Sequence, residues 1–146
     1  MLEAIYVFLG KYLILALGLI IVYYWRRKEE SLVLKLILAC ALAVSFSEVI
    51  KILVPEARPP TSLIGSIADS SFPSSHTAAA VALATTLWFQ KRNSRLVVLL
   101  VALGVAVGRV LVGAHYPFDV LGGAVVGFVT ARLVVPVEIY LKKDKK

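Results

Sequence analysis

The chain has 146 residues, of which 60% are hydrophobic, and it carries a formal net charge of +7. Its mean hydropathy is +0.87, which excludes an ordinary soluble enzyme and indicates a single membrane domain over residues 1–146. The single Cys40 excludes a disulfide framework and a cysteine-based metal site. The basic residues lie in short clusters between apolar runs, a pattern typical of membrane proteins rather than of nucleic-acid-binding surfaces.

Five apolar runs are predicted to be membrane-spanning helices. They cover residues 4–25, 32–54, 74–90, 95–113 and 118–140, close to the ~17–25 residues that cross the hydrocarbon core as a helix. Positive charges follow the first run instead of preceding it, so we interpret that run as a span and not as a cleavable signal peptide. Glycines spaced four apart in the last two runs, Gly104 with Gly108 and Gly123 with Gly127, predict close helix packing. The expected fold is an all-α integral membrane bundle.

Basic clusters predict the orientation of this bundle. They follow the first, third and fifth runs, at residues 26–28, 91–92 and 142–146. Lysine and arginine concentrate in cytoplasmic loops, so the N-terminus is predicted to lie outside and the C-terminus inside. The outer helix ends then carry Lys51, Arg58 and Arg109, which belong to no solubilising cluster. Ionisable groups beside membrane helices are costly, so these three cations indicate a functional site.

Two of the polar groups on the outer side flank the predicted loop 55–73. Taken alone, Lys51 is interpreted as a lysine whose side chain extends to the membrane interface and pairs with Glu48. Arg58 differs, because the prolines around it stiffen the chain. The segment Pro73-Ser74-Ser75-His76 is a good helix start, and the free N–H groups of a helix start bind anions. We interpret Glu56 and Asp69 as solvated loop charges.

The third polar group joins the fourth and fifth runs. Arg109 ends one helix, His115 lies in a short loop, and Asp119 falls in the first turn of the next helix. A histidine within reach of a carboxylate is typical of an activated nucleophile or a general base. An arginine beside it offers a planar fork for an anion such as phosphate.

Together the three groups resemble the signature of the type 2 phosphatidic acid phosphatase superfamily. The matching segments are Lys51-x6-Arg58-Pro59, Pro73-Ser74-Ser75-His76 and Arg109-x5-His115-x3-Asp119. That superfamily includes membrane lipid phosphatases, undecaprenyl diphosphate phosphatases, glucose-6-phosphatases and soluble haloperoxidases. Two positions differ from the usual pattern, Ser75 in place of glycine and Gly108 in place of serine. Members with six spans also have one more helix before the first segment.

The resemblance implies a phosphatase that needs no metal and no cofactor. His115 would attack phosphorus and form a phosphohistidine, while Asp119 fixes its tautomer and His76 protonates the leaving oxygen. The phosphate oxygens would be bound by three cations and two backbone groups: Lys51, Arg58, Arg109, Ser74 and Ser75. Phosphoryl transfer depends mainly on positioning and charge stabilisation, so several cations around one phosphate suit it.

From the resemblance we expect a lipid phosphatase of the plasma membrane with its active site on the outer face. Its substrate is expected to be a prenyl diphosphate such as undecaprenyl diphosphate, phosphatidic acid or phosphatidylglycerol phosphate, and its partners are membrane lipids, not nucleic acid. One alternative is a phosphatase of a small soluble phosphate ester. Another is a non-enzymatic scaffold or anion-binding protein, which leaves the spacing of His115 and Asp119 unexplained. The apolar middle of loop 55–73 either borders a lipid entrance or is a connector.

Overall fold

The computed structural model describes residues 2–60, 62–64 and 69–136, and within these ranges the only regular secondary structure is helix, joined by turns and loops. This confirms the all-α fold expected from the sequence. The elements in chain order are α1 (Leu2–Val7), the π-helical turn η1 (Phe8–Tyr12), α2 (Ile14–Arg26), α3 (Glu30–Leu53), α4 (Ser75–Phe89), α5 (Arg95–Leu111) and α6 (Pro117–Val134).

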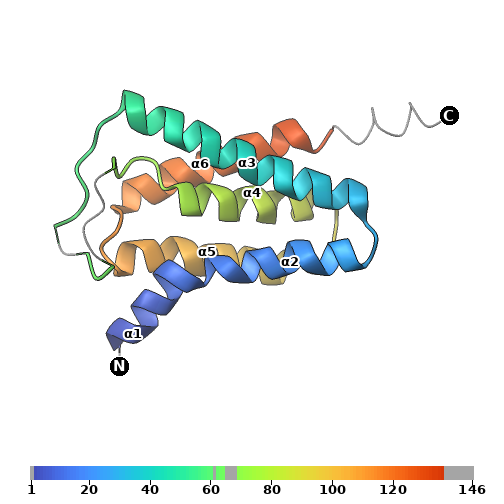
Figure 1. The fold of residues 1–146 in the computed structure, drawn as a ribbon, viewed down its shortest axis with the longest axis horizontal. Helices are drawn as coiled ribbons and strands as arrows, with labels where there is room; N and C mark the ends of the chain where they lie inside the picture. Colours follow the sequence, from blue (N-terminus) through green and yellow to red (C-terminus); the bar gives the residue numbers. More distant parts are fainter. Residues whose placement is uncertain (1, 61, 65–68, 137–146) are drawn as a thin grey trace.

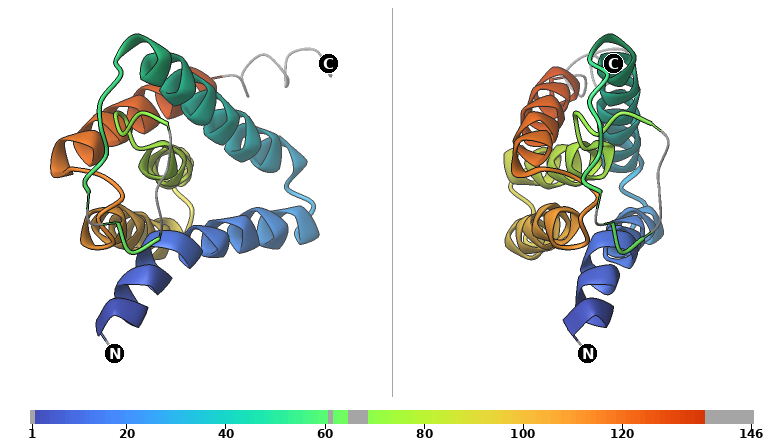
Figure 2. Two further views of the ribbon diagram at one scale, coloured as in Figure 1. Left: turned by 60° about the vertical axis from the view of Figure 1, so that its left-hand side comes forward. Right: turned by 90° about the vertical axis from the view of Figure 1, so that its left-hand side faces the viewer.

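Helix α4 lies at the centre of the bundle, in contact with α2, α3, α5 and α6 (Figures 1 and 2). Its short side chains allow these neighbours to approach, since Ala78, Ala80 and Ala82 are fully buried. Helix α6 crosses α4 at glycines: a Cβ at Gly123 would lie 2.5 Å from the Ser74 carbonyl oxygen, and one at Gly127 would overlap the Ala78 carbonyl oxygen. The glycine spacing therefore did predict close packing in α6.

The first apolar run is not one continuous helix. It consists of α1, η1 and α2, and the two halves Leu2–Tyr12 and Ile14–Arg26 meet at an angle of 44°. The break lies at Leu13, directly after η1, and π-helical turns are a common cause of sharp bends in helices. Helices α3 and α6 are long and apolar enough to cross a membrane, and the bent pair is too if it counts as one span. Helices α4 and α5, with 15 and 17 residues, are shorter, so five spans remain a prediction. Residues 137–146, which hold the end of the last predicted span and its basic cluster, lie outside the described residues.

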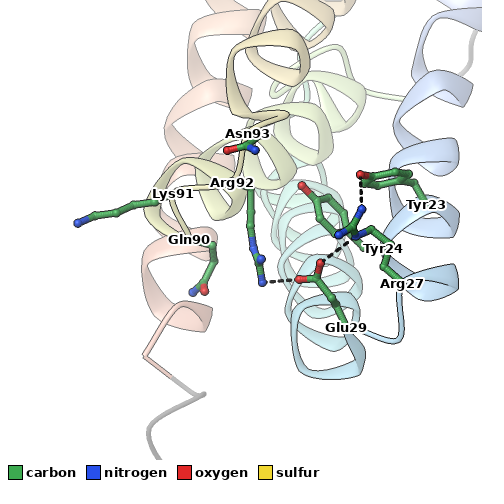
Figure 3. A pocket seen from close by; sticks show the side chains of 8 residues that line it. All are labelled: Tyr23, Tyr24, Arg27, Glu29, Gln90, Lys91, Arg92 and Asn93. Atoms are coloured by element: carbon green, nitrogen blue, oxygen red, sulfur yellow. Dashed lines mark hydrogen bonds and ion pairs between the residues drawn. The ribbon is translucent and has the colours of Figure 1, made fainter.

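One end of the bundle holds the turns α2–α3 and α4–α5 (Figure 3). Glu29 joins these turns, since it pairs with Arg92 and lies 3.6 Å from Arg27 Nε. The three charges line a pocket of about 210 Å³ together with Tyr23, Tyr24, Gln90, Lys91 and Asn93. Two of the basic clusters used to predict orientation therefore lie at the same end, as that prediction requires. The direction in which this end faces remains a prediction.

Candidate active site

The opposite end of the bundle brings the three predicted polar segments together (Figure 1). The segment before α4 is attached to the start of α6, because the Ser74 N–H donates to the Asp119 carbonyl oxygen at 3.0 Å. The loop after α3 is attached to the end of α5 by a bond of 2.9 Å from the Leu63 N–H to the Val112 carbonyl oxygen. These links place residues from distant parts of the sequence around one histidine, His115.

His115 is 2% exposed, and its two ring nitrogens have different partners. Nδ1 lies 2.8 Å from the Ser71 carbonyl oxygen, which can only accept a hydrogen bond. Nε2 lies 3.2 Å from Arg58 Nη1, which can only donate. Both contacts require the same tautomer, in which Nδ1 carries the proton and Nε2 presents its lone pair. The lone pair therefore points to the cationic side of the site.

The surroundings of His115 favour a neutral ring. Burial lowers the pKa of His115 to about 3, assisted by the nearby positive charges of Arg109 and Arg58. The hydrogen bond to Ser71 acts in the opposite direction and is too weak to restore the pKa. An imidazole that stays neutral over the physiological range is available as a nucleophile.

Asp119 lies behind this histidine and is fully buried. Its Oδ2 accepts a bond of 2.8 Å from the Tyr116 N–H and lies 3.4 Å from His115 Nδ1. The carboxylate therefore caps the first turn of α6 and also faces the protonated nitrogen of His115. Asp119 can therefore be both a favourable charge at the helix end and a partner of His115. Its Oδ1 is buried without a hydrogen-bond partner among the described residues.

Arg58 is the residue of the loop after α3 that reaches the histidine. Besides His115, its Nη1 donates to the Ala114 carbonyl oxygen at 2.8 Å. Its Nη2 donates to Asp69 Oδ1 at 2.7 Å and to the Ser70 carbonyl oxygen at 3.2 Å. The guanidinium is thus held on several sides, with Nη1 against Nε2 of His115.

Lys51 is also turned toward this end, and the structure gives it two acidic partners. Its Nζ lies 2.9 Å from Glu48 Oε1 and 3.1 Å from Asp69 Oδ2. The predicted pairing of Lys51 with Glu48 is confirmed. A pocket of about 380 Å³ opens beside Lys51 and Arg58, and its other lining residues are Pro55, Glu56, Ala57, Asp69 and Ser70.

Asp69 is more than the solvated loop charge that the sequence indicated, because its half-exposed side chain also forms two ion pairs. Its carboxylate bridges Lys51 and Arg58, two of the residues expected to bind phosphate. Burial alone would raise the pKa of Asp69, but the hydrogen bonds from Lys51 and Arg58 outweigh it and hold the pKa below its usual range. The sequence offers no signal for this role, because a single aspartate in a polar loop looks like any solvated charge.

The start of α4 supplies both backbone and side-chain groups to the site. Ser74 is the N-cap, and its hydroxyl oxygen accepts from the Thr77 N–H. Since the Ser74 N–H is engaged by Asp119, the first helical residues, Ser75 and His76, have the N–H groups better placed for an anion. The Ser75 hydroxyl donates to Glu48 Oε1 at 2.7 Å. The half-buried His76 lies within electrostatic range of Arg109, Lys51 and Arg58.

Arg109 is 4% exposed and lies close enough to His115 to lower its pKa. Its Nη1 donates to the carbonyl oxygen of Gly10 in η1 at 2.9 Å, a contact across 99 positions of sequence. Gly108, where the resemblance led us to expect serine, packs on the same turn: a Cβ there would lie 2.5 Å from the Leu9 carbonyl carbon. The N-terminal segment thus occupies the space that a serine side chain would need.

Comparisons with known proteins identify the family of the chain. Residues 32–143 match the family model of the PAP2 superfamily, and the chain belongs to that family. The resemblance inferred from the three segments is thereby confirmed. Among curated relatives, the undecaprenyl-diphosphatase BcrC of Bacillus subtilis is 31% identical over 142 residues, covering 90% of this chain and 72% of the relative. The putative undecaprenyl-diphosphatase YbjG of Escherichia coli is 33% identical over 133 residues, covering 84% of this chain and 67% of the relative.

Two solved structures share the fold. The PAP2-type phosphatidylglycerolphosphate phosphatase of Bacillus subtilis superposes with a TM-score of 0.68 at 22% identity, covering 95% of this chain and 76% of that one. LpxE of Aquifex aeolicus superposes with a TM-score of 0.72 at 24% identity, covering 92% of this chain and 83% of that one. At these identities the likeness establishes the fold alone. The family and the apolar helices identify a membrane protein whose relatives are phosphatases.

Proposed function

We propose that this protein hydrolyses a lipid diphosphate, with undecaprenyl diphosphate as the leading candidate, through a phosphohistidine on His115. The observation that carries the proposal is the fixed tautomer of His115, whose Nε2 lone pair lies beside the Arg58 guanidinium. A neutral nucleophile beside a cation suits attack on an anionic phosphorus centre. The names of the curated relatives favour a prenyl diphosphate over a glycerolipid phosphate.

In the proposed first step, His115 Nε2 attacks the terminal phosphorus of the diphosphate. A nitrogen–phosphorus bond forms, the bridging phosphorus–oxygen bond breaks, and the lipid monophosphate leaves with a proton from His76. The positive charge that develops on the imidazole is stabilised by Asp119, whose Oδ2 lies 3.4 Å from Nδ1. In the second step, water attacks the phosphorus while His76 accepts its proton. The nitrogen–phosphorus bond then breaks, which returns the lone pair to His115 Nε2, and inorganic phosphate is released.

Binding of the transferred phosphoryl group is assigned in this proposal to Lys51, Arg58 and Arg109, with the backbone N–H groups at Ser75 and the start of α4. Cations and helix-start amides stabilise the charge that spreads over the non-bridging oxygens. The sequence resemblance also assigns Ser74 to this phosphate-binding set. Its N–H already binds the Asp119 carbonyl oxygen, which favours a role in positioning α4 against α6.

A phosphate-release assay in detergent tests the proposal. The panel compares a prenyl diphosphate, phosphatidic acid, phosphatidylglycerol phosphate and glucose 6-phosphate, with His115→Ala as the blank. We expect release from the prenyl diphosphate at the highest kcat/KM and a loss of several orders of magnitude in His115→Ala. Release from glucose 6-phosphate alone would point to a soluble substrate, and no release from any compound would favour a non-enzymatic anion-binding protein.

We further propose that the reaction needs no metal ion. No group of three His, Cys, Asp or Glu side chains that could hold a metal occurs in the described part of the chain, and both histidines have roles in phosphoryl transfer. Activity should therefore persist in excess EDTA. Loss of activity that Mg²⁺ restores would refute this part of the proposal.

The site is proposed to face the outside of the plasma membrane, in a five-span bundle with the N-terminus out and the C-terminus in. Support comes from the basic turns at the opposite end of the bundle. In a Cys40→Ser background, Ser62→Cys should react with a membrane-impermeant maleimide in intact cells. Asn93→Cys, at the other end, should react only after lysis, and the reverse pattern would invert the proposed orientation.

A further inference from the structure

The cations of the site differ in how their charges are balanced. Lys51 and Arg58 share the carboxylate of Asp69, and Lys51 also contacts Glu48. Arg109 forms no ion pair among the described residues, although the charge of Asp69 acts on it from a distance, and its side chain is anchored on a neutral carbonyl oxygen, that of Gly10. A carbonyl fixes a guanidinium in place without cancelling its charge. Arg109 therefore keeps the most uncompensated charge of the three for an incoming anion.

Arg109 also has a buried hydrogen-bond donor that is not in use. Its Nε is inaccessible to solvent and has no partner within the described residues. A buried donor on a charged group is costly to leave unsatisfied. Because Arg109 acts electrostatically on His115, a phosphate oxygen bound at the histidine is the natural acceptor. The orientation of the guanidinium then depends on the group that holds its other end, the carbonyl of Gly10.

The position of the Gly10 carbonyl depends on the π-helical turn η1. The Leu13 N–H donates to the Phe8 carbonyl oxygen at 3.0 Å, a step of five residues that interrupts the regular α-helical ladder. The N-terminal helix bends by 44° here. Turns of this type are rare and are frequently found at functional sites.

Two glycines allow this turn to approach α5. A Cβ at Gly10 would lie 2.7 Å from the Gly108 carbonyl oxygen and 2.8 Å from both methyl groups of Val112. A Cβ at Gly108 would lie 2.6 Å from the Gly10 nitrogen. Real Cβ atoms do not make contacts this short, so a side chain at either position would push the turn away and lengthen the bond to Arg109.

We propose that Gly10 is a positioning residue of the active site, whose carbonyl orients Arg109 for binding the phosphoryl group. This inference rests on the proposed phosphatase function. It extends the active site to the N-terminal segment, which lies outside residues 32–143 matched by the family model. The pair Gly10 and Gly108 then acts as one unit, since each glycine leaves room for the other.

The kinetic test is a double-mutant cycle of Gly10→Ala and Arg109→Gln, assayed on a prenyl diphosphate in detergent. Gly10→Ala alone should lower kcat/KM at least tenfold, mainly through kcat. In the Arg109→Gln background, Gly10→Ala should lower kcat/KM less than twofold, because the guanidinium that Gly10 positions is already absent. The matched control is Gly18→Ala in α2, where an added Cβ meets no atom within 4 Å, and it should stay within twofold of wild type.

A second test is spectroscopic. It does not use Gly10→Ala, so it remains informative even if that variant fails to fold. Gly10-Lys11 is the only Gly-Lys pair in the sequence, so labelling glycine with ¹³C at the carbonyl and lysine with ¹⁵N gives one correlation peak for the Gly10 carbonyl. That carbonyl shift should change in Arg109→Gln. An unchanged shift, or a Gly10→Ala loss that persists in full in the Arg109→Gln background, would overturn the proposal. If wild-type protein releases no phosphate, the proposed function fails, and the carbonyl shift still decides the role of Gly10.

Discussion

The burial of a neutral His115 predicts an acid-sensitive protein. Its pKa is lowered from 6.5 to about 3 by burial and by the charges of Arg109 and Arg58. Between these two pH values the unfolded chain binds a proton that the folded protein does not. The free energy of unfolding therefore falls as the pH drops below 6.5, and the loss continues until the pH approaches 3.

The size of the effect follows from the shift. One pKa unit corresponds to about 1.4 kcal/mol, so lowering the pH from 7 to 5 removes roughly 2 kcal/mol through this histidine. For a chain of this size that is about 4–8 °C in Tm. The assay compares the fall in Tm between pH 7 and pH 5 in detergent for wild type and for His115→Gln. Groups common to both proteins cancel in the difference.

We expect the wild type to lose several degrees more than His115→Gln over this interval. Glutamine has the hydrogen-bonding capacity of the ring without its titration, so the variant isolates the proton. An equal fall in Tm for the two proteins would show that His115 titrates in the folded protein near its ordinary pKa. The argument for a permanently neutral nucleophile would then be lost.

Three further substitutions test the contacts around this histidine and between the helices. Asp69→Asn removes the carboxylate that bridges Lys51 and Arg58, so inorganic phosphate should inhibit the variant at a several-fold lower concentration; unchanged inhibition would contradict the bridging role. Arg58→Lys cannot reproduce the fork that joins His115 to Asp69, and kcat should fall on the order of 10²-fold, whereas near-normal turnover would show that charge alone suffices. Gly127→Ala pushes a methyl group into the backbone of α4 and should cost about 1–3 kcal/mol of stability; a Tm no lower than that of Gly18→Ala would contradict the close crossing of α4 and α6.

The sequence predicted the helices and the gathering of polar groups at one end because both follow from simple regularities. Apolar length predicts helices, and alternating direction puts every second turn on the same side. The predicted helix directions placed the three segments around Lys51, His76 and His115 at the same end of the bundle, and the structure brings them together there. Their order and spacing also matched the family that the comparisons then identified.

The partners of the charged groups could not be predicted in the same way. Asp69 resembles any loop carboxylate until folding places it between two cations. The carbonyl that holds Arg109 belongs to Gly10, and since every residue has a carbonyl, no side-chain pattern marks this one. The bend beside η1 lies inside a predicted span whose only charged residue is Lys11, and hydropathy predicts a straight helix there. Each of these features depends on packing between distant segments.

The bridge that Asp69 makes between Lys51 and Arg58 has a consequence for how the site distinguishes anions. Lys51 and Arg58 are already paired with Asp69, so in the proposed reaction an arriving headgroup exchanges places with a carboxylate that carries a single negative charge. A group with more charge and more oxygen atoms than a carboxylate gains from this exchange, whereas the carboxylates and bicarbonate of the surroundings gain little. The same carboxylate is available to return when phosphate departs, which favours release of the product. Under the proposed function, a carboxylate that competes with the substrate in this way lowers the affinity for phosphate but increases the selectivity for phosphate and the rate of product release.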